Sequence, residues 1–308
     1  MSESTAALRR KIESAGELRS VVRTMKALAA SSIGQYERSA QALEEYYRTV
    51  ELGLIACFRG HPRPRRGGPS RRGPVGVVVF GSDQGLVGQF NEVVVEHALR
   101  MLEKIPGERH VWAVGERAQA RLSDAGVAVS GGFAVPHSVA GIAPLVGRIL
   151  VSCEGRYDAD GELHLLYNRR GPVSLPGSSI RAEGVYTLAS QRLLPLDEEW
   201  LEGLAQLPWP TPLLPEAIGG ETTLRTLIRE YLFVSLFRAC ADSLVSENAS
   251  RLAAMERADK NIDELLTALN ASFHQLRQSG IDEELFDLVA GFEAMAQPDI
   301  QHQTKGSP

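Results

Sequence analysis

The segment closest in composition to a chemical site is FGSDQGLVGQFN, residues 80–91, which directly follows a run of apolar residues. Glycines in a strand-to-helix turn let backbone amides face a phosphate group, so the segment could hold a nucleotide. However, Gly81, Gly85 and Gly88 have the spacing GxxxGxxG rather than GxGxxG, and GxxxxGK[ST] occurs nowhere in the chain. No acidic residue ends the next apolar run, where a ribose partner would be expected. The pattern favours a structural turn over a nucleotide site.

An acidic segment, YDADGELH, begins like a calcium-binding loop, because Asp158, Asp160 and Glu162 alternate with other residues. Such a loop needs glycine at its sixth position and glutamate at its twelfth, but Leu163 and Arg169 stand there. The segment therefore does not predict a calcium site.

The chain lacks the other common arrangements for metal binding, redox chemistry and nucleophilic catalysis. Its three cysteines, Cys57, Cys153 and Cys240, form no CxxC pair, its histidines form no HExxH pattern, and no GxSxG occurs. The formal net charge of −5 argues against a nucleic-acid partner held by bulk charge. We therefore expect no catalytic residues, no metal, no cofactor and no nucleic-acid partner.

Residues 3 to about 58 contain no proline and predict one long helix. Apolar or small residues recur along it in alternating steps of four and three, which is the heptad pattern of a coiled coil. Several of these positions hold small side chains, so a neighbouring helix can approach closely there. The positions are Leu18, Val22, Met25, Ala29, Ser32, Tyr36, Ser39, Leu43, Tyr46 and Val50.

Residues 221–296 also contain no proline and predict a second long helix with the same alternation. Asp259 is its one polar position, and at Gly280 the pattern slips by one residue, which changes the local winding. At about 1.5 Å per residue the two helices would extend roughly 80 Å and 110 Å, so they must pack on each other and part must protrude. The apolar positions are Leu252, Met255, Ile262, Leu266, Leu269, Phe273 and Leu276, then Ile281, Leu285, Leu288, Phe292 and Met295.

The sequence between the two helices predicts a different kind of structure. Residues 59–74 hold six arginines, four glycines and four prolines, which is typical of a flexible basic loop. Apolar runs and helical patterns then alternate, which predicts an α/β domain with a mostly parallel sheet. We expect strands at 75–82, 110–115, 126–130, 161–168 and 181–190, and helices at 89–104, 116–124 and 141–154.

The predicted fold class is therefore α/β: a long antiparallel coiled coil of the N- and C-terminal helices with an inserted Rossmann-like α/β domain. The expected segments are the first helix at 1–58, the basic loop at 59–74, the α/β domain at 75–195, a proline-rich connection at 196–220, the second helix at 221–296 and a tail at 297–308.

Four segments resemble, in order along the chain, the gamma subunit of F-type ATP synthases. VVRTMKALAASS at 21–32 resembles the amino-terminal helix of that family, and the turn at 80–91 is similar to its SDRGLCGGFN-like turn. SENASRLAAMERADKNIDEL at 246–265 and RQSGIDEELFDLVAGFEAM at 277–295 resemble its carboxy-terminal signature. Each match alone is moderately specific, but four in family order bracket almost the whole chain.

Several positions depart from the family pattern. Gln84 stands where the family usually has Arg or Lys, Val87 where Cys is common, and Ser32 where Lys is usual. Asp282 replaces a threonine and Phe292 an alanine of the carboxy-terminal signature. These departures resemble a divergent branch, such as the gamma subunit of an alternative, sodium-pumping ATPase.

The resemblance implies a central rotor shaft and not an enzyme. The paired helices would stand inside a ring of alternating alpha and beta subunits, and the α/β domain would sit on the membrane-embedded ring of c subunits, with the epsilon subunit as a further partner. Ion flow would turn the shaft and force each beta subunit through its nucleotide-binding states. The chain would lie on the cytoplasmic face of a bacterial or archaeal cell membrane, with membrane contact only through the complex.

The resemblance also implies which residues contact the beta subunits. Arg277 would pair with an acidic beta loop, a charge-assisted contact that can engage and release. Asp282 facing the same loop would be repulsive. The implied contact residues are Met25, Lys26, Arg277, Gln278, Asp282 and Glu284.

Two other functions fit parts of the sequence. The chain could be a stand-alone coiled-coil scaffold with an inserted α/β domain, or a nucleotide-dependent α/β enzyme that uses the turn at Gly85. Neither alternative accounts for four motifs in family order.

Overall fold

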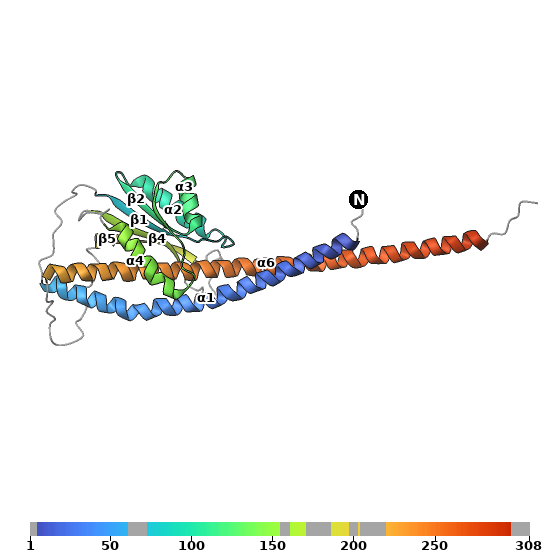
Figure 1. Cartoon of the computed structure of the whole chain (residues 1–308), viewed down its shortest axis with the longest axis horizontal. Coiled ribbons are helices and arrows are strands. Elements are labelled where there is room, and N and C mark those ends of the chain that lie inside the picture. The colour runs from blue at the N-terminus through green and yellow to red at the C-terminus, as the bar shows by residue number, and fades with distance from the viewer. Residues whose placement is uncertain are drawn as a thin grey trace, which may run out of the picture. The chain divides into compact units, whose positions relative to one another are not determined.

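The computed structural model describes residues 5–60, 73–154, 161–170, 186–196, 203 and 220–296. Most of the predicted basic loop and of the proline-rich connection lies outside these residues, as do the predicted tail and Asp158 and Asp160 of the acidic segment. The chain divides into two compact units, one of Met1–Thr24 with Glu256–Pro308 and the other of Met25–Met255. Two long helices contribute to both units: α1, Thr5–Gly60, and α6, Gly220–Ala296 (Figure 1).

The larger unit contains a five-stranded sheet. Its strands are β1 Val75–Phe80, β2 Arg109–Val114, β3 Val129–Phe133, β4 Glu162–Arg170 and β5 Tyr186–Leu194. They lie in the order β3-β2-β1-β4-β5, and only the β4–β5 pair among them is antiparallel. The prediction of a mostly parallel sheet is confirmed.

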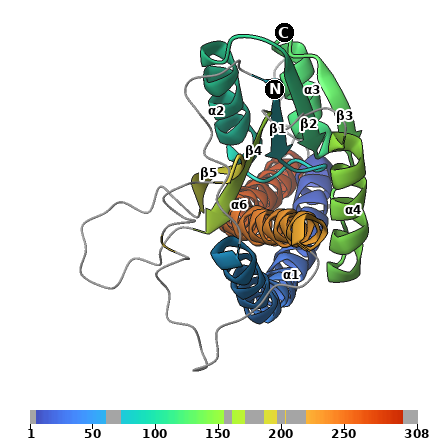
Figure 2. The ribbon, with the colours of Figure 1, turned by 90° about the vertical axis from the view of Figure 1, so that its left-hand side faces the viewer.

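Helices cover both faces of this sheet, which explains why the central strand β1 is apolar and buried along its whole length. On one face lie α2, Phe90–Lys104, and α3, Glu116–Asp124 (Figure 2). On the other face lie α1, α6 and α4, Ile142–Cys153, which follows the short helix η1, Val139–Gly141. The largest fully buried side chain, Trp112, belongs to this second layer.

The third strand begins three residues later than predicted. We expected residues 126–130, but β3 covers Val129–Phe133, because Gly126 ends helix α3 with a φ of +81°. The strand then contains two glycines, because neighbouring side chains already occupy the space in which a Cβ would lie. A Cβ on Gly131 would lie 2.9 Å from Trp112, and a Cβ on Gly132 would lie 2.1 Å from the Gln119 side chain.

The fifth strand also lies later in the sequence than predicted. We expected residues 181–190, of which 181–185 lie outside the described residues, and β5 continues to Leu194. The three shorter helices, in contrast, begin and end within one residue of the predicted bounds.

Within the larger unit, α1 and α6 run antiparallel, as predicted. The Tyr46 hydroxyl donates to Glu230 at 2.7 Å, and the rings of Tyr47 and Tyr231 lie 6.0 Å apart. Of the predicted apolar positions on this part of α1, Ala29, Tyr36 and Val50 are buried. Tyr46 is an exception: it is 43% exposed, because its hydroxyl remains at the edge of the helix pair.

Within the smaller unit, the beginning of α1 packs on the second half of α6. Arg19 contacts Asp263 at 2.6 Å and Asp259 at 3.4 Å, so Asp259, the polar position of the pattern, meets a cation from the other helix. Leu8, Ala15, Val22 and Ile262 are buried there. The prediction for Leu18 was wrong, because this side chain is 54% exposed.

The last part of α6 extends past the beginning of α1, and no other helix of the described residues lies beside it (Figure 1). All its residues from 277 to 292 are exposed, and the helix continues through Gly280. The expectation that part of the helix pair protrudes is confirmed at this end. Among the described helices, none contains a stretch long and apolar enough to span a bilayer.

Candidate functional site

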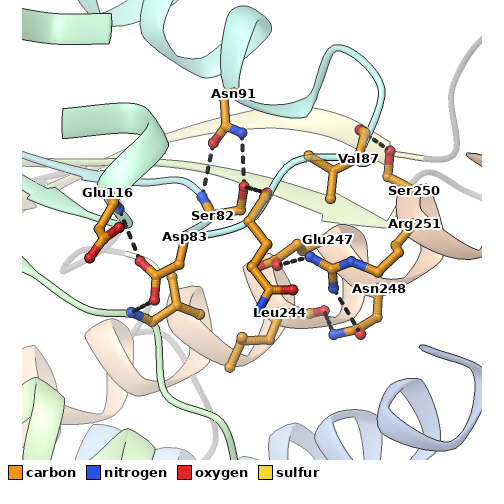
Figure 3. A network of polar contacts seen from close by, with 12 residues as sticks. Ser82, Asp83, Val87, Asn91, Glu116, Leu244, Glu247, Asn248, Ser250 and Arg251 are labelled. Carbon is orange, nitrogen blue, oxygen red and sulfur yellow. Dashed lines mark hydrogen bonds and ion pairs between the residues drawn. The ribbon is translucent and has the colours of Figure 1, made fainter. Parts of the chain in front are cut away.

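The turn between β1 and α2 is held by a small buried network of hydrogen bonds (Figure 3). The Ser82 amide donates to Asn91 Oδ1 at 2.9 Å, and Asn91 Nδ2 donates to the Ser82 hydroxyl at 2.8 Å. That hydroxyl donates in turn to the Gln84 carbonyl at 2.8 Å. These bonds join the two ends of the turn to each other. Both side chains are almost completely buried, so water does not compete for the bonds.

Asp83 occupies the place where this turn could have held an anion. Its carboxylate accepts from the Glu116 amide at the N-terminus of α3 and from the Val135 amide, both at 2.9 Å. The N-terminus of a helix attracts negative charge, and here the chain's own carboxylate supplies it. The first glycine of the motif is required by packing: a Cβ on Gly81 would lie 2.4 Å from the Ala118 Cβ. These contacts favour the structural interpretation of the glycines.

The second half of the turn presents a carbonyl group to helix α6. Leu86 and Gly88 have positive φ angles of 62° and 59°, and the Val87 side chain between them is buried. The Val87 carbonyl accepts from the Ser250 hydroxyl and, at 3.4 Å, from the Phe90 amide. Two of the motifs found in the sequence, more than 160 residues apart, therefore meet at this bond.

The facing part of α6 carries charged groups that are unusual in a buried position. Arg251 donates to Glu247 at 2.6 Å and lies 3.4 Å from the Asn248 side-chain oxygen, and Asn248 donates to the Leu244 carbonyl at 2.8 Å. Burial raises the pKa of the Glu247 carboxyl and the nearby Asp83 raises it further, whereas Arg251 lowers it. The second carboxylate oxygen of Glu247 has no hydrogen-bond partner.

This network lies at the place where open α/β sheets commonly bind ligands. That place lies beyond the carboxyl ends of the strands, where the strand order reverses, here between β1 and β4. Asn168 of β4 donates to the Phe90 carbonyl at 2.9 Å, and α6 contacts the turn through Ser250. The described residues gather no group of three or more His, Cys, Asp or Glu side chains that could hold a metal ion. The arrangement joins β4 to the start of α2, and α6 to the turn after β1.

Four of the six predicted contact residues lie together on the exposed end of α6. Arg277, Gln278, Asp282 and Glu284 all belong to the smaller unit and are exposed. Met25 and Lys26 lie on α1 in the larger unit, where both side chains are half-buried. The structure therefore brings four of the predicted residues onto one helix segment, and the other two form a pair elsewhere.

An exposed apolar stripe runs between these polar residues. Successive residues of an α-helix are rotated by about 100°, so positions three, four and seven apart share a face. Arg277 and Gln278 lie at the two sides of the stripe that this rotation defines. Its members and their exposed fractions are Ile281 at 55%, Leu285 at 59%, Leu288 at 64% and Phe292 at 75%.

Sequence reasoning missed the burial of the polar residues 246–250. The run SENAS was noticed only as part of a motif, because polar residues in a long helix are ordinarily solvent-exposed. In the structure Ser246, Glu247, Asn248 and Ser250 are all buried. One sequence signal could have indicated their burial: the polar run directly follows a strongly apolar part of the same helix and is long enough to include positions on its buried face.

A family model described as ATP synthase matches residues 4–295. A curated relative, the ATP synthase gamma chain of Nocardioides sp., is 29% identical, with 96% of this chain and 98% of the relative covered. The ATP synthase gamma chain of Rubrobacter xylanophilus is also 29% identical, with 94% and 97% covered.

Two solved structures share the fold. One is the Euglena gracilis mitochondrial ATP synthase rotor, with a TM-score of 0.59, 15% identity, and 90% of this chain and 98% of that chain covered. The other is the Tetrahymena thermophila mitochondrial ATP synthase central stalk and c-ring, with a TM-score of 0.53, 21% identity, and 77% and 99% covered. At these identities the likeness concerns the fold.

Proposed function

We propose a function from one premise: the chain belongs to the ATP synthase family, whose model matches residues 4–295, and its relatives over nearly the whole length are gamma chains. The proposed function is that of the gamma subunit, a non-catalytic central rotor shaft. It couples ion-driven rotation of the c-ring to ATP synthesis or hydrolysis on the beta subunits. The proposed place is the cytoplasmic face of the membrane, as a peripheral part of the complex.

The observation that carries this proposal is the exposed apolar stripe at the end of α6. Large apolar side chains in a continuous exposed patch mark an interaction surface, because their removal from water by a partner is favourable in free energy and stabilises the complex. A bore formed by alternating alpha and beta subunits would surround such a helix. The α/β domain would sit on the c-ring, and the epsilon subunit would complete the rotor.

The polar residues beside the stripe supply contacts that can engage and release during rotation. We propose that Arg277 and Gln278 meet an acidic segment of a beta subunit, because a guanidinium forms strong bonds with carboxylates. Asp282 and Glu284 on the same segment would oppose that contact when they face the same acidic groups. On the larger unit, Met25 and Lys26 remain the proposed contacts of the first helix.

The test is the complete ATP synthase complex in vesicles, assembled with and without this chain. ATP hydrolysis and ATP-driven transport are measured together, with both protons and sodium ions as the transported ion. Transport that needs the chain supports the proposal. Equal transport without the chain would contradict it.

The paired substitution Arg277→Ala with Gln278→Ala tests the contact residues in the same assay. We expect transport to fall roughly ten-fold with normal assembly, because a charge-assisted contact is worth about 1.5–3 kcal/mol. The matched control is Gln275→Ala with Glu283→Ala, two exposed residues on the side of the helix away from the stripe. Wild-type rates of hydrolysis and transport in the Arg277 and Gln278 variant would show that these residues do not make the contact.

A further inference from the structure

We propose that Ser250 is a positioning residue of the rotor: its hydroxyl fixes the turn after β1 to helix α6, and this joint passes torque between the α/β domain and the shaft. The inference rests on the proposed function, in which the α/β domain is driven by the c-ring. The larger unit as a whole must transmit torque from the α/β domain to α6, and we assign part of this role to one buried side chain.

The hydrogen bonds around Ser250 divide into two separate groups (Figure 3). Those of Ser82, Asp83 and Asn91 remain within the turn and its neighbouring elements. Those of Asn248 and Arg251 remain within α6. In this network of described residues, the bond from Ser250 to Val87 is the one that crosses from the helix to the turn.

Near Ser250, the remaining contacts of α6 with the α/β domain are mostly apolar, whereas the polar contacts of Arg229 with Glu154 and of Tyr231 with Gln191 lie more than five turns closer to the start of the helix. Leu236, Leu244 and Val245 pack in the same cluster as Trp112. Apolar burial is non-directional, so a helix that rotates or slides by a small step keeps most of it. A buried hydrogen bond is directional, and buried polar groups are known to fix the register of packed helices.

The two sides of the bond are stiff before they meet. Leu86 has a φ of 62°, a conformation that costs free energy for a residue with a side chain, and the Ser82 and Asn91 bonds join the two ends of the turn in which it lies. On the helix, the ion pair of Glu247 and Arg251 spans the single turn that contains Ser250. If α6 rotated or slid by a small distance, the stiff turn would not move with it. The Val87 carbonyl would then lose its hydroxyl donor.

The experiment compares Ser250→Ala with Ser272→Ala in the complete complex reconstituted into vesicles. Ser272 is a matched control, because it is exposed on the same helix and its hydroxyl donates to the Ala268 carbonyl of its own helix at 3.0 Å. The readouts are the number of ions transported per ATP against an opposing gradient, and hydrogen exchange of the amides in residues 82–90.

We expect Ser250→Ala to lower the ratio of ions to ATP while the rate of ATP hydrolysis stays unchanged. Exchange in residues 82–90 should rise about five-fold, since the lost net hydrogen bond shifts the opening of the turn by that factor. Ser272→Ala should leave both values at the wild-type level. A role in folding alone would reduce the amount of assembled complex but not the ratio within it.

A wild-type ratio in assembled Ser250→Ala complexes would overturn the proposal. If that variant does not assemble, Ser250→Cys decides, because its thiol is a weaker donor of similar size: a lowered ratio supports the joint, and an unchanged ratio overturns it. The proposed function fails separately, and the joint with it, if complexes with the wild-type chain transport no more ions than complexes without it.

Discussion

At the scale of single residues, Glu247 is the most unusual group in the larger unit. The residue is 5% exposed, and burial raises the pKa of its carboxyl above the ordinary value of 4.5. Asp83 raises the pKa further, whereas Arg251, and more weakly His137, favour the charged form. Because the pKa is higher in the folded than in the unfolded chain, this group contributes stability below pH 4.5 and loses it as the pH rises through the folded value.

The first prediction concerns this pH dependence. Glu247→Gln removes the titrating group, so the free energy of unfolding of the wild type should fall relative to that of the variant as the pH rises from about 4.5 toward the raised pKa. Urea unfolding followed by tryptophan fluorescence at several pH values measures the difference. Glu283→Gln, an exposed position, is the control and should run parallel to the wild type. A constant difference between wild type and Glu247→Gln across that range would show that the carboxyl is not perturbed.

At the scale of elements, the heptad pattern predicted the helix pairing but not its width. Every seventh residue, Leu8, Ala15, Val22, Ala29 and Tyr36, is buried, because α1 meets α6 along that line. Leu18 belongs to the same repeat and is exposed, so the smaller unit uses a narrower contact than a full heptad seam. A single chain's pattern cannot state how many residues of each heptad reach the partner helix.

The glycines of the first turn show the same limit. Their spacing excluded a dinucleotide fingerprint, but it could not tell which glycine is required by packing. In the structure α3 approaches the end of β1 so closely that Gly81 contacts Ala118, whereas a Cβ on Gly85 would meet only the Arg117 side chain, at an ordinary contact distance of 3.9 Å. Gly81 and Gly85 can be told apart only from the distance between α3 and the end of β1, which the sequence does not give.

This difference gives a prediction. Gly81→Ala should destabilise the larger unit by about 1–3 kcal/mol, because the added Cβ would lie 2.4 Å from the Ala118 Cβ. Gly85→Ala should change the stability by less than about 0.5 kcal/mol, since the nearest atom, Nη2 of Arg117, is 3.9 Å away. Urea unfolding of the two variants provides the comparison. Equal losses in both would mean that α3 does not approach the strand this closely.

At the scale of the whole molecule, the fold and the proposed function were largely predictable because long proline-free helices and four ordered motifs carry them. The predicted contact residues Arg277, Gln278, Asp282 and Glu284 lie on an exposed surface, as contact residues must. The polar joint at Ser250 was not predictable, because it depends on which carbonyl of a distant turn reaches the helix. Local patterns describe faces of elements, whereas such a joint is set by tertiary packing.

The central claim, that the chain is a rotor shaft, is tested most directly by watching it turn. Asp124→Cys places a thiol on the exposed end of α3, and the three natural cysteines are buried, so a probe attaches there selectively. In a surface-fixed complex with alpha and beta subunits, we predict that ATP drives the probe in continuous rotation in one direction. A probe that stays fixed, or moves randomly in both directions, while the same complexes hydrolyse ATP would contradict the account.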